Sequence, residues 1–215
     1  MSLILKLLLG LHIAAGFTAL AAGTAAWLTV KGSRKHSLSG RVFFFSMMAV
    51  VVTAFVVAVF RFNPFLLLIA AFSFYMTYTG YRSLILRRMH QPAPAQADWI
   101  AVATGAAFLI AMATVLILRK PDNVSAVLIP GVFSVIFAGM LFTDAKSYLQ
   151  KQPWQRQQLM LRHISRMGGA FIATVTAFVV VNVHVEPAFI PWLLPTVVFT
   201  PLIAYHSRKI KLQLT

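Results

Sequence analysis

The sequence predicts an all-α membrane protein: a bundle of seven transmembrane helices with the N-terminus outside the cell and the C-terminus in the cytoplasm. Three observations carry this prediction. Of the 215 residues, 60% are hydrophobic and 11% are charged, whereas soluble domains are near half apolar and a quarter charged. Seven apolar stretches approach the length of about 20 residues that spans a bilayer as a helix. Basic residues gather in alternate connections between those stretches.

The first apolar stretch contains Lys6 and the small residues of Ala19-Leu20-Ala21, a pattern that also occurs in signal peptides. The stretch continues to Val30, which is too long for a signal core, so we expect a retained first helix. The whole chain, 1–215, is predicted to form a single polytopic membrane domain. Its predicted helices are 3–30, 42–60, 65–86, 99–118, 125–143, 164–183 and 189–205.

Proline marks two of the connections and the last helix. Asn63-Pro64 predicts a tight turn after the second helix, because the residue before a proline disfavours continued helix. Segment 91–96 contains two prolines and predicts an extended linker. The last stretch has three prolines, which predict kinks because neighbouring groups in a membrane bundle satisfy the freed carbonyls: Pro191, Pro195 and Pro201.

The basic residues set the orientation. Fifteen of the nineteen lysines and arginines fall on one predicted side of the membrane, and the other side has only Lys6, Arg61, Arg119 and Lys120. By the positive-inside rule the richer side is cytoplasmic. This predicts a multi-pass protein of a bacterial inner (plasma) membrane. The net charge of +15 is then explained by topology and by anionic lipid headgroups on the cytoplasmic side, and we expect no nucleic-acid partner.

Several activities are excluded because their residues are missing. The sequence has no cysteine, which rules out thiol catalysis and thiolate metal sites. The last predicted helix has no lysine for a retinal Schiff base, and the chain has no His-Glu-x-x-His, P-loop or Gly-x-Ser-x-Gly motif. Any bound metal must therefore rest on histidine, which favours haem, copper or zinc.

Ionisable residues gather where the predicted helices meet the cytoplasmic interface. Such groups are costly at membrane depth and usually face the bundle interior or a water-filled cavity, so this layer is the candidate polar site. The alternative is that the side chains only contact lipid headgroups. We interpret Asp144 as the one acidic residue at a cytoplasmic helix end and expect an ion pair with Arg82, His163 or Arg166. The layer comprises His36, Arg41, Arg82, Asp144, His163 and Arg166, with His206 nearby.

The histidines are the candidate ligands. We expect His36 and His163 to face the bundle interior and to share a polar cavity that opens to the cytoplasm, where they could bind a metal. His12 should face inward in a separate pocket of the outer half. It could ligate haem together with His184, or it could pack between helices as a hydrogen-bonded side chain.

Two further helix faces are patterned. Tyr75, Tyr78, Thr79 and Arg82 recur at i, i+3, i+4 and i+7, which places them on one face of the third helix. That face should point into the bundle, because hydroxyl groups need hydrogen bonds that lipid cannot provide. It could line a polar path or only join helices. On the first helix, small residues predict the close approach of another helix: Gly16, Ala19 and Gly23.

Two segments carry a family resemblance. Leu11-His12-Ile13-Ala14-Ala15-Gly16 and Lys35-His36-Ser37-Leu38-Ser39-Gly40-Arg41-Val42-Phe43 resemble the small bacterial membrane proteins of domain-of-unknown-function family 2306. In that family a histidine lies in the first helix, and a histidine followed by Gly-Arg and an aromatic residue opens the second. The resemblance covers mainly residues 11–60. It implies a multi-helix membrane fold without an assigned activity, and it singles out His12, His36, Gly40 and Arg41.

Three functional hypotheses follow. The first is histidine-dependent binding of haem or a transition metal, or proton relay, through His12, His36 and His163. The second is a small-solute or lipid transporter lined by the polar face of the third helix. The third is a non-catalytic subunit that forms an oligomer or joins a larger membrane complex. The sequence indicates no catalytic residue.

Overall fold

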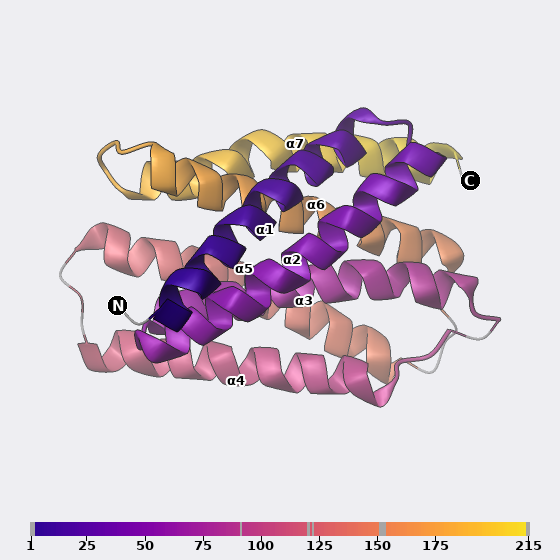
Figure 1. The fold of residues 1–215 in the computed structure, drawn as a ribbon. Coiled ribbons are helices and arrows are strands. Elements are labelled where there is room, and N and C mark those ends of the chain that lie inside the picture. Colours follow the sequence, from indigo (N-terminus) through magenta and orange to yellow (C-terminus); the bar gives the residue numbers. More distant parts are fainter. Residues whose placement is uncertain (1–2, 91, 120, 122, 151–153, 214–215) are drawn as a thin grey trace.

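The computed structural model describes residues 3–90, 92–119, 121, 123–150 and 154–213. All regular secondary structure within those ranges is helical (Figure 1). Each helix is long and apolar enough to cross a membrane, so the expected all-α, seven-helix architecture of a multi-pass membrane protein is confirmed. The helices are α1 (Leu3–Leu28), α2 (Arg34–Phe60), α3 (Pro64–Arg88), α4 (Gln96–Arg119), α5 (Val124–Leu149), α6 (Arg156–Asn182) and α7 (Phe189–Gln213).

Consecutive helices run in opposite directions, and the two chain termini lie at opposite ends of the bundle (Figure 1). We call the end with the α1–α2, α3–α4 and α5–α6 connections the C-terminal end, and the other the N-terminal end. Helix α3 is central, because it packs against α2, α4, α5 and α6. Helices α1 and α2 form an antiparallel pair that lies across the others.

The lipid-facing surface is apolar. Phe45 of α2, Ile110 of α4 and Val135 of α5 are 65%, 68% and 74% exposed. Soluble monomers rarely expose contiguous apolar surface of this kind, whereas in a bilayer such side chains are solvated by acyl chains. The distribution of exposed residues therefore agrees with the spanning length of the helices.

Helices α3 and α6 approach closely through reciprocal contacts between glycine and methionine. A Cβ atom on Gly80 of α3 would lie 2.9 Å from the sulfur of Met167, and one on Gly169 of α6 would lie 2.7 Å from the sulfur of Met76. Small residues allow such approach in membrane bundles. This interface positions α6 so that its arginines reach the polar face of α3.

The small residues of α1 behave in part as expected. Ala19 and Gly23 are buried, and a Cβ atom on Gly23 would lie 2.5 Å from the ring of Phe171 on α6. Gly16, in contrast, has nothing within 4 Å of its Cβ position. The close contact of α1 with Phe171 of α6 is therefore made at Gly23, and Gly16 does not contribute to it.

Four predicted boundaries at the C-terminal end of the bundle are wrong. Helix α2 begins at Arg34 rather than at 42, and α5 ends at Leu149 rather than at 143. Helix α6 begins at Arg156 rather than at 164, and α7 continues to Gln213 rather than ending at 205. The prediction followed apolarity, whereas the extra turns are polar and remain helical.

Local capping explains why two of these polar turns are helical. The Ser33 hydroxyl accepts a hydrogen bond from the backbone N–H of His36 at 3.2 Å, and Gln155 and Gln158 form a capping box at the start of α6. Caps of this kind satisfy the free N–H groups of a first turn. As a result, His36 lies in the first turn of α2 and His163 lies further inside α6, rather than in the connections before these helices.

Candidate functional site

Asp144 is the centre of a buried ionic cluster near the C-terminal end of the bundle. It is 4% exposed. It lies near the end of α5 and projects toward α3 and α6. The Tyr75 hydroxyl donates to its Oδ2 atom at 2.6 Å. Arg162 and Arg166 of α6 each place a guanidinium nitrogen 3.0 Å from one carboxylate oxygen. The expected ion pair between Asp144 and Arg166 is therefore present, and Arg162 is a second partner that the sequence reasoning missed.

Both guanidinium groups lie close to aromatic rings. Arg162 lies over the rings of Tyr148 and Trp154, at 5.3 and 5.7 Å from their centroids, and Arg166 lies 5.6 Å from the centroid of Tyr75. The Tyr148 hydroxyl also accepts a hydrogen bond from Arg162 at 2.7 Å. We define the Asp144 cluster as Tyr75, Asp144, Tyr148, Trp154, Arg162 and Arg166.

Long side chains, rather than backbone packing, join α5 to α6. Within the described ranges, no Cα atom of α5 approaches a Cα atom of α6 within 8 Å. The two helices are connected across this distance by the salt bridges from Arg162 and Arg166 to Asp144. The signal for the second arginine was available in the sequence, since residues four apart lie on one helix face.

Asp98 forms a second buried ionic cluster, and it corrects two expectations. The Nε atom of Arg82 donates to both oxygens of Asp98, at 3.1 and 3.2 Å, so Arg82 pairs with Asp98 and not with Asp144. Asp98 is 1% exposed, and it also accepts from the Tyr78 hydroxyl at 3.0 Å and from the Ala95 N–H at 2.8 Å. Asp144 is thus not the one acidic residue at this end. We define the Asp98 cluster as Tyr78, Arg82 and Asp98.

The polar face of α3 serves both clusters. Tyr75 and Thr79 are 1% exposed, and Tyr78 and Arg82 are half-buried, so this face lies inside the bundle as expected. Tyr75 contacts Asp144, whereas Tyr78 and Arg82 contact Asp98. The Thr79 hydroxyl donates to the Tyr75 carbonyl of its own helix at 2.6 Å. One face of α3 therefore holds two carboxylates from two other helices.

His36 and His163 are half-buried, and each binds a backbone carbonyl. The Nδ1 atom of His36 lies 3.0 Å from the Ala26 oxygen of α1, and that of His163 lies 2.9 Å from the Gly80 oxygen of α3. Because a carbonyl only accepts, both Nδ1 atoms carry the proton. The described residues contain no group of three or more histidine, aspartate or glutamate side chains placed to hold a metal ion.

His12 joins α1 to α2. Its Nδ1 atom lies 2.9 Å from the Thr53 hydroxyl oxygen and 3.2 Å from the Val50 carbonyl oxygen. The Thr53 hydroxyl donates to the Ala49 carbonyl of its own helix at 2.7 Å, so it is free to accept the imidazole proton. This is the inter-helix hydrogen bond that was the alternative to haem ligation. His184, the expected second haem ligand, is exposed beyond the end of α6.

The remaining candidates of the polar layer lie outside both clusters. Arg41 is exposed on α2. His206 of α7 is half-buried and packs edge-on against Trp27 of α1, with ring centroids 5.7 Å apart. Neither residue takes part in the salt bridges around Asp98 or Asp144. The layer that appeared uniform in the sequence is divided into two ionic clusters and separate packing contacts.

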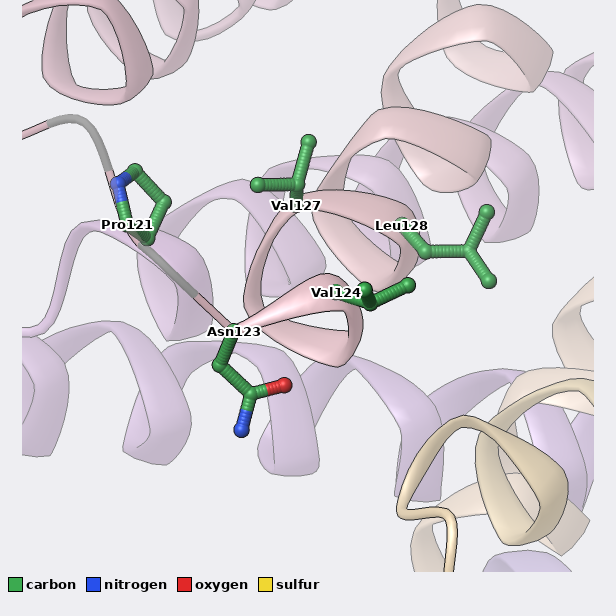
Figure 2. Close-up of a pocket in the computed structure, with 5 residues that line it drawn as sticks. All are labelled: Pro121, Asn123, Val124, Val127 and Leu128. Atoms are coloured by element: carbon green, nitrogen blue, oxygen red, sulfur yellow. The ribbon is translucent and has the colours of Figure 1, made fainter.

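Two surface hollows lie at the N-terminal end, far from the ionic clusters. One, of about 350 Å³, is lined by Pro121, Asn123, Val124, Val127 and Leu128 at the start of α5 (Figure 2). The other, of about 410 Å³, lies among the ends of α3, α4, α5 and α7, with Met112, Ile129 and Trp192 in its wall. Neither is the polar cavity predicted for His36 and His163, because those residues lie near the opposite end.

The fold and its ionic core define the class: a multi-pass membrane protein with two carboxylates buried against arginines inside the bundle. No protein-family model, curated protein or solved structure matches the chain significantly. The resemblance to domain-of-unknown-function family 2306 therefore stays a prediction, and any activity must be inferred from the site itself.

Proposed function

We propose that this chain is a transporter of small solutes in a bacterial inner membrane, and that solute binds in the polar core formed by the Asp144 and Asp98 clusters. The observation that carries the proposal is the convergence of three arginines and two tyrosines on two buried carboxylates, Asp98 and Asp144. Ionisable groups in a membrane bundle are costly, and they usually mark substrate or ion pathways. A structure that only needed to be stable could fill this space with apolar side chains.

The same proposal includes an orientation. The C-terminal end of the bundle carries the fifteen basic residues counted above and faces the cytoplasm under the positive-inside rule, where anionic lipid headgroups would contact exposed residues such as Arg41. The N-terminus is then outside. The solute site lies in the cytoplasmic half, within reach of the α3–α4 and α5–α6 connections.

Solute transport is favoured over histidine ligation. The Nδ1 atoms of His12, His36 and His163 each bind a group of a neighbouring helix or turn, which is the behaviour of packing histidines. Arg162 and Arg166 are different, because both bind Asp144 and each also has a buried N–H group without a hydrogen-bond partner among the described residues. The polar core therefore offers a solute more unused hydrogen-bonding capacity than the histidines do.

The test is uptake into proteoliposomes that contain the purified protein. Internal solute is measured after exposure to a panel of small organic and inorganic anions, cations and neutral polar solutes. We expect uptake of at least one solute, loss of that uptake in Arg166→Gln, and unchanged uptake in Arg41→Gln. Arg41 is the matched control, since it is an arginine near the same end that is exposed and outside the clusters.

One result would contradict the transporter proposal. If protein that is folded by circular dichroism and monodisperse in detergent moves no solute in the panel, and no fluorescent lipid between leaflets, the transporter proposal is wrong. The hypothesis of a non-catalytic subunit then takes its place.

A further inference from the structure

The Asp144 cluster has more positive charge than its one carboxylate can neutralise. Among the described residues, the salt bridges of Arg162 and Arg166 all go to Asp144. Two guanidinium groups thus face a single carboxylate, which leaves one unit of positive charge in a buried place. The Asp98 cluster is different, because Arg82 and Asp98 balance one to one. Burial of an uncompensated charge costs several kcal/mol in real proteins, so the excess needs an explanation.

Unused donors lie in the same place as the excess charge. The Nε atom of Arg162 and the Nη1 atom of Arg166 are buried and have no hydrogen-bond partner within the described part of the chain. Arg166 as a whole is 7% exposed, and its Nη1 atom is itself buried. A buried donor without a partner is destabilising. One donor atom on each arginine therefore lacks an acceptor, while the oxygens of Asp144 already accept from Tyr75, Arg162 and Arg166.

The planar shape of the guanidinium groups restricts the kind of ligand that could supply the acceptor. Both arginines lie close to aromatic rings, those of Tyr75, Tyr148 and Trp154, and their unused N–H bonds lie in the guanidinium planes. An acceptor must therefore approach in those planes. Carboxylate and phosphate groups approach arginine in this way, and their negative charge also neutralises the excess.

We infer that the polar core binds an oxyanion, a carboxylate or phosphate group, at Arg162 and Arg166 beside Asp144. The inference deepens the proposed transport function by naming its substrate class. The oxyanion can belong to a free solute or to the headgroup of an anionic lipid, because the two arginines recognise only the anionic group. In either case Asp144 acts as an internal counterion with which the bound group competes.

Competition with Asp144 gives a test that does not require the natural ligand. In Asp144→Asn the two arginines lose their internal counterion, while the side chain keeps its size. The melting temperature of the purified variant is measured with increasing sodium phosphate or sodium acetate, against sodium chloride at the same ionic strength. We expect Asp144→Asn to melt lower than the wild type and to regain stability, with saturation, in phosphate or acetate only.

Asp98→Asn is the matched control, because it leaves one guanidinium group, Arg82, without a carboxylate, whereas Asp144→Asn leaves two on one site. It should be destabilised without comparable recovery in oxyanion. In the wild type, isothermal titration with phosphate and acetate measures binding directly. We expect binding about tenfold weaker in Arg162→Gln or Arg166→Gln, which is the loss of one hydrogen bond to a charged group.

The lipid composition distinguishes the two possible sources of the oxyanion, a lipid headgroup and a soluble solute. The wild type is measured in nanodiscs of pure phosphatidylcholine and of phosphatidylcholine with phosphatidylglycerol. Stabilisation by phosphatidylglycerol that Arg166→Gln abolishes supports the site with a lipid headgroup, and stabilisation by free phosphate or acetate supports it with a soluble solute. If Asp144→Asn responds equally to all salts and the wild type responds to neither oxyanion nor phosphatidylglycerol, the inference is wrong. Because these are binding measurements, oxyanion binding without uptake in proteoliposomes would reject transport and leave the site intact.

Discussion

Arg82 of α3 binds both carboxylate oxygens of Asp98 on α4 through a single atom, Nε, at 3.1 and 3.2 Å. The bond crosses the α3–α4 connection and fixes the first turn of α4 to the central helix. Asp98 is also an acceptor for Tyr78 and for the Ala95 N–H. A carboxylate in the first turn of a helix is further stabilised by the positive end of the helix dipole.

The first prediction is that Asp98→Ala destabilises the protein by about 3 kcal/mol, because removal of one partner leaves a buried charge uncompensated. Tyr78→Phe removes one hydrogen bond to the same carboxylate and should cost about 1–2 kcal/mol. Both are measured as the free energy of unfolding in mixed detergent micelles. Equal stability of Asp98→Ala and the wild type would show that Arg82 finds another acceptor or water.

The second prediction compares two glycines of α1. Gly23→Ala places a methyl group against the Phe171 ring, where a Cβ atom would lie 2.5 Å away, so we expect α1 to shift and stability to fall by about 1–3 kcal/mol, the usual range for overpacking. Gly16→Ala meets nothing within 4 Å and should be neutral or slightly stabilising, since alanine favours helix. Thermal unfolding of the two variants side by side checks this. A larger effect at Gly16 would contradict the packing of α1 on α6.

The third prediction concerns His12. If its role is the hydrogen bond to Thr53 and Val50, His12→Leu should lose about 0.6–1.7 kcal/mol, the range measured for hydrogen bonds between membrane helices. Thr53→Val should lose a similar amount, and the double variant should cost less than the sum of the two. Visible absorbance of the purified wild type is the companion measurement. A Soret band that His12→Leu removes would restore haem ligation as the role of this residue.

The fourth prediction concerns orientation. Reporter fusions after His90 and at the C-terminus should report the cytoplasm, and a fusion after Asn63 should report the outside, because the basic residues are distributed fifteen to four. A cytoplasmic signal after Asn63 would reverse the orientation or remove a span. The measurement uses alkaline phosphatase and a fluorescent protein as paired reporters, each active on one side.

The sequence was sufficient for the parts of the fold that depend on apolarity and spacing. Long apolar stretches predicted the seven helices, and spacing on α3 predicted that Tyr75 and Thr79 face the interior. The ion pair between Asp144 and Arg166 could also be predicted, because a single carboxylate at membrane depth needs a basic neighbour. These inferences use rules that act along one helix or on the bundle as a whole.

The rest depends on where helices end and on which of them are neighbours. The apolar criterion made the predicted helices too short, and Asp98 was therefore left outside the predicted helix 99–118, whereas it lies in the first turn of α4. Arg82 was one of three predicted partners for Asp144 because both residues lie at one depth, yet it pairs with Asp98 of α4 instead. Depth can be read from sequence, but the angular position of each helix around α3 cannot.

The two carboxylates also give the α4–α5 hairpin a mechanical asymmetry. Salt bridges join the hairpin to its neighbours at the C-terminal end. They are made by Asp98 near the start of α4 and by Asp144 near the end of α5. At its other end the hairpin meets them through apolar side chains such as Met112 and Ile129, beside a hollow of about 410 Å³. Salt bridges therefore hold the α4–α5 hairpin to its neighbours at the C-terminal end, and apolar contacts line the other end.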